Sequence, residues 1–132
     1  MKLAAQVPKL LFICSRNKIR SLTAEKVFGN RPDCHVRSAG TRAGARIVVT
    51  EGHIGWADII FCMEKSHANQ LRAKFTEALD AKPIICLHIP DDYEFMQAEL
   101  VDELIAKVAP YLPPNESAFP LKPGLSCDDA GA

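Results

Sequence analysis

The sequence has no apolar run long enough to cross a membrane, no cysteine pair at metal-binding spacing and no excess of charge of either sign. A spanning helix needs about 20 apolar residues. Lysine plus arginine and aspartate plus glutamate number 16 each, so bulk charge does not attract the chain to nucleic acid or to an anionic membrane. None of the five cysteines belongs to a Cys-x-x-Cys pair, which argues against a zinc site. We therefore expect no metal, no cofactor, no membrane and no nucleic-acid partner.

The sequence also lacks the features of a secretory signal. Pro8 interrupts the first apolar stretch, which is too short for the hydrophobic part of such a signal. An odd number of cysteines without a pairing pattern is typical of reduced thiols in a reducing compartment. We expect a cytoplasmic protein.

The length of 132 residues favours a single domain, but the composition changes near its end. Proline is frequent from position 113 onward, and such a composition resists regular structure. We expect an α/β domain over residues 1–112 and a proline-rich C-terminal tail over residues 113–132.

Short apolar runs typical of strands alternate with amphipathic stretches typical of helices. The expected strands are 10–13, 35–37, 58–62 and 83–87. The expected helices are 21–28, 50–56, 67–75 and 97–108, with Ser21, Thr50 and Ser66 as N-terminal caps of the first three. This alternation predicts a four-stranded parallel sheet with helices on both faces, which binds ligands beyond the carboxyl ends of its strands.

The most informative segment is residues 9–21, where an apolar strand leads into Cys14, five further residues, Arg20 and a serine. A short loop between a strand and a helix can direct several backbone N–H groups at one oxyanion. The same field stabilises a thiolate at Cys14, and the planar guanidinium of Arg20 can hold two phosphate oxygens. Asn17 suits a left-handed backbone conformation, and Asn17 and Ser21 can hydrogen-bond the sulfur. The expected phosphate-binding residues are Ser15, Arg16, Asn17, Lys18, Ile19, Arg20 and Ser21.

The loop resembles that of the low-molecular-weight protein tyrosine phosphatase family, and three later motifs are similar to that family in the same order. They are Ser-Ala-Gly-Thr at 38–41, Asp-Ile-Ile-Phe-Cys-Met-Glu-Lys-Ser at 58–66 and Ile-Pro-Asp-Asp-Tyr at 89–93. The resemblance covers residues 8–111 and implies the strand order 2-1-3-4, as in phosphotyrosine protein phosphatase I. It implies Cys14 as nucleophile, Arg20 as phosphate ligand and Asp91 as general acid. Tyr93 and Asp92 would flank the substrate.

Two departures from the family pattern affect the expected chemistry. Ile19 stands where the family usually has a second cysteine, so we expect no redox control through that position. A longer family segment is reduced here to residues 41–44, and the missing stretch includes the aromatic wall of the substrate pocket. We therefore expect an open pocket beside Cys14 and little preference for aromatic over alkyl phosphoesters.

Together with the resemblance, these features predict a cysteine-dependent phosphomonoesterase, similar to a protein tyrosine phosphatase, that acts on a phosphorylated protein or small molecule through a phosphocysteine intermediate. One alternative is an arsenate reductase of the same fold, which needs another thiol within reach of Cys14. A second alternative is a phosphate-binding module without turnover, and a third makes Cys14 an inert core thiol. The sequence leaves open the physiological substrate, the oligomeric state, the role of the tail and the choice between Asp91 and Asp92 as the acid.

Overall fold

A computed structural model describes residues 7–112, and the expected proline-rich tail lies outside the described residues. Four strands form one parallel sheet in the order β2-β1-β3-β4. Their bounds are β1 (Lys9–Cys14), β2 (His35–Gly40), β3 (Ile59–Cys62) and β4 (Ile84–Cys86). The predicted fold class and strand order are confirmed.

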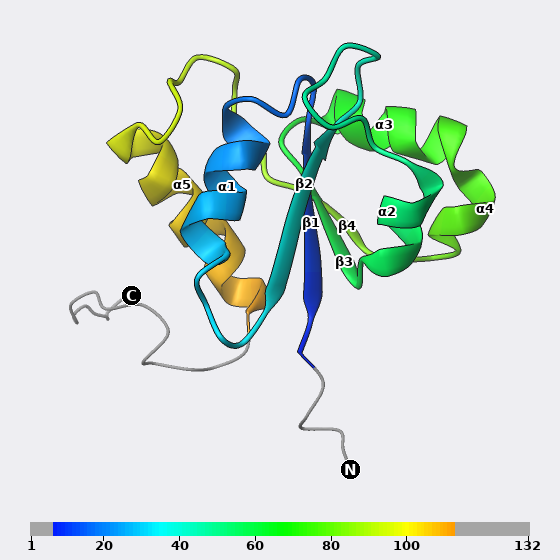
Figure 1. The fold of residues 1–132 in the computed structure, drawn as a ribbon, viewed down its shortest axis with the longest axis horizontal. Coiled ribbons are helices and arrows are strands. Elements are labelled where there is room, and N and C mark those ends of the chain that lie inside the picture. The colour runs from blue at the N-terminus through cyan, green and yellow to red at the C-terminus, as the bar shows by residue number, and fades with distance from the viewer. Residues whose placement is uncertain (1–6, 113–132) are drawn as a thin grey trace.

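The helices cover both faces of this sheet (Figure 1). One face carries α1 (Arg20–Phe28) and α5 (Ala98–Val108), and the short 3-10 helix η2 (Ala109–Tyr111) follows α5. The other face carries α2 (Glu51–Trp56), α3 (Lys65–Lys74) and α4 (Thr76–Leu79). No helix within residues 7–112 is long and apolar enough to span a membrane.

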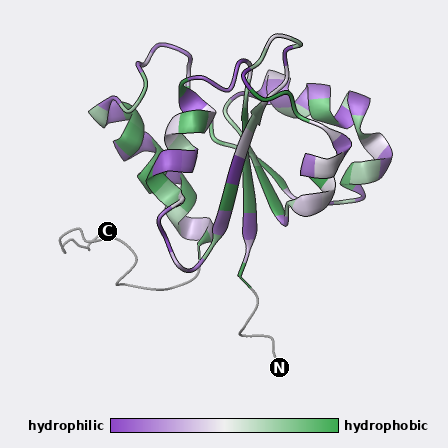
Figure 2. Ribbon diagram, in the orientation of Figure 1, coloured by the Kyte–Doolittle hydropathy of each residue, from purple (hydrophilic) through white to green (hydrophobic). Residues whose placement is uncertain are grey.

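Alternate residues of β1 supply two separate cores, because successive side chains of a strand point to opposite faces. Leu10, Phe12 and Cys14 belong to the core beneath α1 and α5, where the Phe12 ring stacks on those of Phe28 and Phe61. Leu11 and Ile13 belong to the core beneath α2, α3 and α4. Figure 2 shows hydrophobic residues along the central strands and hydrophilic residues on the outward sides of the helices.

The predicted helix caps are confirmed in one case and wrong in two. The Thr50 hydroxyl accepts the His53 N–H at the start of α2, as predicted. Ser21 lies inside α1, which begins at Arg20 without a side-chain cap, and its hydroxyl contacts the Cys14 sulfur instead. Ser66 lies inside α3, where the preceding Glu64 is the capping residue. In both helices the capping position lies two residues before the predicted serine, at Ile19 and at Glu64.

Strand β2 is longer than predicted, since Ser38, Ala39 and Gly40 pair in register with the last three residues of β1. Gly40 thereby packs against the chain that follows β1. A Cβ atom at Gly40 would lie 2.6 Å from the Ser15 carbonyl oxygen and 3.0 Å from the Arg16 carbonyl carbon. These are backbone atoms, so no side-chain rotation relieves the clash. The close approach of β2 to residues 15 and 16 requires glycine.

We predict that Gly40→Ala lowers the free energy of unfolding by about 1–3 kcal/mol, the usual range for overpacking. Gly44→Ala is the matched control, because no atom lies within 4 Å of a Cβ built at Gly44. Chemical denaturation of the two variants measures the difference. Equal stability of Gly40→Ala and Gly44→Ala would show that β2 and the loop can separate at no cost.

Candidate active site

The loop between β1 and α1 is held from outside by residues 41–46, which we call the rim loop. The carbonyl oxygens of Cys14, Ser15 and Arg16 accept the backbone N–H groups of Thr41, Arg42 and Arg46, over 3.0, 3.0 and 2.9 Å. The Asn17 carbonyl oxygen accepts the Arg46 Nε–H over 3.1 Å. Four consecutive carbonyl groups are therefore bound on the rim-loop side.

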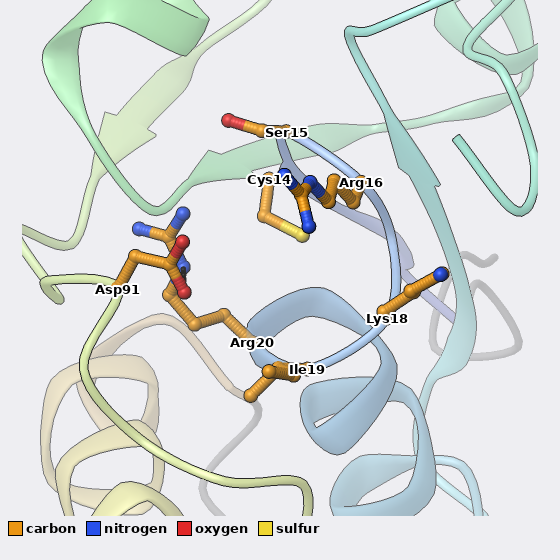
Figure 3. A pocket seen from close by; sticks show the side chains of 7 residues that line it. All are labelled: Cys14, Ser15, Arg16, Lys18, Ile19, Arg20 and Asp91. Atoms are coloured by element: carbon orange, nitrogen blue, oxygen red, sulfur yellow. Dashed lines mark ion pairs between the residues drawn. The ribbon is translucent and has the colours of Figure 1, made fainter. Parts of the chain in front are cut away.

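The N–H groups of the same loop are, by contrast, available to a ligand. Those of Ser15, Arg16, Lys18 and Ile19 donate to no acceptor among residues 7–112. Unpaired backbone N–H groups need an acceptor. This loop, at the N-terminus of α1, is therefore suited to bind an anion. A cavity of about 80 Å³ lies there, lined by Cys14, Ser15, Arg16, Lys18, Ile19, Arg20 and Asp91 (Figure 3).

Cys14 lies at the base of this cavity, with 3 % of its surface exposed. The Asn17 N–H donates to its sulfur over 3.2 Å, and the Ser21 Oγ lies 3.0 Å from it. Asn17 has the left-handed backbone conformation that the sequence predicts, with a φ of 59°. Its amide Nδ2 donates to both Ser21 Oγ and Ser38 Oγ, each over 2.8 Å.

This network favours one donor for the hydrogen bond between the Ser21 hydroxyl and the Cys14 sulfur. Ser21 is fully buried and already accepts a hydrogen bond from Asn17. If Cys14 donated to it as well, the Ser21 hydroxyl hydrogen would have no acceptor among the described residues. A buried unsatisfied donor costs about 1–3 kcal/mol. The arrangement therefore favours a Ser21 hydroxyl that donates to the Cys14 sulfur.

The Arg20 side chain is buried, and two hydrogen bonds hold one side of its guanidinium group. Its Nη1 donates to Glu64 Oε2 over 2.6 Å and to the Ile89 carbonyl oxygen over 2.8 Å. Its Nε and Nη2 form no hydrogen bond within residues 7–112, and Nε lies 3.8 Å from Asp91 Oδ1. Because the two bonds to Nη1 hold the guanidinium plane, the opposite edge is left for a bidentate contact.

Residues 89–93, which we call the acid loop, bring Asp91, but neither Asp92 nor Tyr93, to the cavity. Asp91 lies beside the Arg20 guanidinium on one side, and Lys18 lies on the opposite side (Figure 3). The Asp91 side chain is 61 % exposed, so water can reach it. Asp92 is exposed and does not line the cavity. Tyr93 packs against the core beneath α1 and α5 and lines a separate groove with α5.

His67 connects α3 to the loop and was not identified from the sequence. Its Nδ1 accepts the Glu64 N–H over 3.1 Å, so Nε2 carries the proton and donates to Ser15 Oγ over 2.9 Å. Burial, followed by the charge of Arg20, lowers the pKa of His67. The imidazole is consequently neutral at pH 7 and positions Ser15 without adding charge.

The other described cysteines are not placed to exchange a disulfide with Cys14. Cys34 precedes His35, which pairs with the first residue of β1, whereas Cys14 is the last, about 16 Å along the strand. Cys62 lies in the core on the opposite face of the sheet, and burial raises its pKa to about 12. Cys86 pairs with Cys62 in register and points to that same face. Cys127 lies outside the described residues.

Comparisons with known proteins match at the level of structure. No protein-family model and no curated protein matches the sequence. The tyrosine phosphatase Wzb from Escherichia coli K30, solved in complex with phosphate, matches with a TM-score of 0.66 at 21 % identity, over 80 % of this chain and 96 % of that chain. SP-PTP, a low-molecular-weight protein tyrosine phosphatase from Streptococcus pyogenes, matches with 0.68 at 16 % identity, over 82 % and 95 %.

The chain has the low-molecular-weight protein tyrosine phosphatase fold. The YwlE arginine phosphatase from Geobacillus stearothermophilus matches with a TM-score of 0.58 at 22 % identity, over 79 % of this chain and 94 % of that chain. Solved structures with this fold are therefore described as phosphatases with more than one kind of substrate. A shared fold does not specify the reaction, which depends on the side chains of the site.

Several side chains that support the site of this phosphatase fold escaped the sequence analysis. They form contacts between distant segments, so no local spacing reveals them. Glu64 offered the clearest signal, because it is an acidic residue just after a strand, at the edge of the sheet where ligands bind. The residues missed are Glu25, Ser38, Arg46, Glu64 and His67.

We predict that Ser21→Ala slows alkylation of Cys14 by iodoacetamide at pH 7 by about 10- to 100-fold. A hydrogen bond to a charged group contributes about 1.5–3 kcal/mol, and this one stabilises the thiolate that reacts. Mass spectrometry of the Cys14 peptide gives the rate. Ser66→Ala, an exposed serine of α3, is the control and should react like the wild type. An unchanged rate in Ser21→Ala would mean that its hydroxyl does not donate to the sulfur.

Proposed function

We propose that the protein is a cysteine-dependent phosphomonoesterase, like the phosphatases whose fold it has. The observation that supports this most strongly is that one cavity is lined by a buried cysteine, an arginine with a free edge, an exposed aspartate and unpaired backbone N–H groups. A site that only bound phosphate would need the donors but would have no use for a buried cysteine whose sulfur contacts the Asn17 N–H and the Ser21 hydroxyl.

In the first step, the Cys14 thiolate attacks phosphorus in line with the ester oxygen. The S–P bond forms, the P–O bond to the leaving group breaks, and Asp91 gives its proton to the departing oxygen. The equatorial oxygens bear the charge that develops. They would bind to the loop N–H groups and to the Nε and Nη2 edge of Arg20, which Glu64 and the Ile89 carbonyl hold in position.

In the second step, water attacks the phosphocysteine. Asp91 takes a proton from the water, the new P–O bond forms, and the S–P bond breaks to return the Cys14 thiolate and release phosphate. The Ser21 hydroxyl and the Asn17 N–H stabilise the thiolate as the leaving group of this step. No residue outside the cavity is required for proton balance.

Arsenate reduction is less well supported, because that chemistry needs a second thiol that reaches Cys14. Cys34, Cys62 and Cys86 lie at the far end of the strand or on the opposite face of the sheet. Burial also raises the pKa of the Cys34 and Cys62 thiols, which keeps both protonated and unreactive at neutral pH.

The test of the proposed function is hydrolysis of a panel of aryl and alkyl phosphomonoesters, with vanadate as inhibitor. We expect turnover in the wild type, with weak discrimination between aryl and alkyl esters once leaving-group reactivity is allowed for. Cys14→Ser should bind phosphate without turnover. Arg20→Lys should lose about 10²-fold or more in kcat/KM, because an ammonium cannot make the bidentate contact. Arg31→Lys, which alters a buried arginine paired with Asp33 far from the cavity, is the control. Wild-type activity in Cys14→Ser would exclude the covalent mechanism.

We predict that the adjacent aspartates differ in their effect on turnover. Asp91→Asn should lower kcat by about 10²- to 10⁴-fold for alkyl phosphates, which have poor leaving groups, and by less for p-nitrophenyl phosphate. Asp92→Asn makes the same chemical change one residue away, outside the cavity lining, and should have little effect. A larger loss in Asp92→Asn than in Asp91→Asn would exchange the two roles.

A further inference from the structure

We propose that a groove beside the cavity binds a second anionic group of the substrate, so that the preferred substrates are phosphomonoesters whose leaving group carries another phosphoryl or carboxylate group. This inference rests on the proposed function and names the substrate class of that site. The groove has a volume of about 300 Å³ and is lined by Arg16, Lys18, Arg42 and Gly44. Arg16 and Lys18 also line the phosphate cavity, so the two hollows adjoin each other.

The cations of this groove have no partner within the described part of the chain. Arg16, Lys18 and Arg42 are exposed, and none of their side chains forms an ion pair or hydrogen bond with residues 7–112. Other cations near the site are already engaged. Arg20 pairs with Glu64, and Arg46 lies 4.0 Å from Glu25. Three unpaired like charges around one hollow repel one another, and a bound anion relieves that repulsion.

The rim loop fixes the position of Arg42 through its backbone. Its N–H donates to the Ser15 carbonyl oxygen over 3.0 Å, and its own carbonyl oxygen accepts the Ala45 N–H over 3.0 Å. Gly40 closes the base of the loop by donating to the Ile47 carbonyl oxygen and accepting the Val49 N–H. The guanidinium of Arg42 has no part in this scaffold, so a ligand can use it without disturbing the phosphate loop.

The distribution of charge also sets the direction in which a leaving group extends. Its ester oxygen has to face Asp91, but the rest of the group passes out of the cavity mouth toward one rim. The acid-loop side carries the exposed carboxylates of Asp91 and Asp92, whereas the rim-loop side carries the three unpaired cations. An anionic leaving group is therefore repelled from the first side and attracted to the second.

The groove also differs in kind from a site for a phenyl ring. None of its four lining residues is aromatic or aliphatic, and the fourth, Gly44, has no side chain. An apolar leaving group gains little contact area there, while a second anion several bonds from the scissile phosphate can meet three cations. The formal net charge of the whole chain is zero, so this attraction is a local property of the groove.

Binding to Cys14→Ser provides a test that does not depend on turnover. Titration calorimetry at low ionic strength compares fructose 1,6-bisphosphate with fructose 6-phosphate. We expect the bisphosphate to bind about five- to twentyfold more tightly, as several partly exposed charge contacts would give, and this advantage to shrink as salt is added. Adding Arg42→Gln should remove most of the advantage. Arg72→Gln, an exposed arginine of α3 outside the groove, should retain it.

Kinetics on the active protein identify the source of the second anion. The kcat/KM values for the two fructose phosphates are compared with those for phosphotyrosine peptides flanked by aspartates or by serines. Preference for the bisphosphate points to a small molecule, and preference for the acidic peptide points to a protein. Either supports the groove if Arg42→Gln abolishes it while kcat/KM for p-nitrophenyl phosphate stays within about twofold.

Two results would overturn the inference and leave the proposed function intact. One is hydrolysis of p-nitrophenyl phosphate with no advantage for any second anion in binding or kinetics. The other is an advantage that persists unchanged in Arg42→Gln. Absence of turnover on every phosphoester would instead contradict the proposed function, and the binding comparison would still decide whether the groove holds an anion.

Discussion

The site depends on one constraint, which is that hydrogen bonds from the rim loop occupy the carbonyl groups of residues 14–17. Backbone donors and acceptors compete for partners, and a loop with free carbonyl groups could equally well present those to the cavity. Because the rim loop engages the carbonyl side, the N–H side remains for an anion. The absence of a side chain at Gly40 allows the two segments to come close enough for this arrangement.

A buried polar chain extends this constraint to the nucleophile. Glu25 accepts the Ser38 hydroxyl, Ser38 and Ser21 accept the Asn17 amide, and the Ser21 hydroxyl is left to the sulfur. Each member fixes the donor direction of the next, so the last hydroxyl of the chain is directed at the Cys14 sulfur. Partly satisfied buried networks are costly, and the Ser21 hydroxyl hydrogen finds an acceptor among the described residues only when the sulfur accepts it.

Positive charge is divided between a fixed cation and a set of free ones. Arg20 is buried and held by Glu64 and the Ile89 carbonyl, which sets its orientation before a ligand arrives. His67 is neutral and adds positioning without charge. Arg16, Lys18 and Arg42, which have no partner within residues 7–112, line the groove that we propose binds a second anion of the substrate. Under the proposed function, Arg20 would stabilise the reacting phosphoryl group, whereas Arg42, which lines only the groove, would act on the leaving group.

The sequence was sufficient for the features that depend on local pattern. Apolar runs and amphipathic spacing gave the strands and the main helices, and the resemblance gave the strand order that the structure confirms. The sequence pointed to Asn17 because asparagine is favoured at left-handed backbone positions of tight loops, and Asn17 has that conformation. Ser21 and Ser66 were misassigned as caps because both helices begin one residue before the serine, and serine is favoured at a cap whether or not the helix starts there. Glu64, His67 and the rim loop act across long sequence separations, which no spacing rule reports.

The central claim is that Cys14 becomes phosphorylated during turnover. The direct measurement is mass spectrometry of the protein quenched in acid within milliseconds of mixing with an aryl phosphate, using Asp91→Asn to slow release of the intermediate. The account predicts a mass increase of one phosphoryl group on the peptide that contains Cys14, and its absence in Cys14→Ser. Turnover without any phosphorylated Cys14, or a phosphoryl group on another residue, would contradict it.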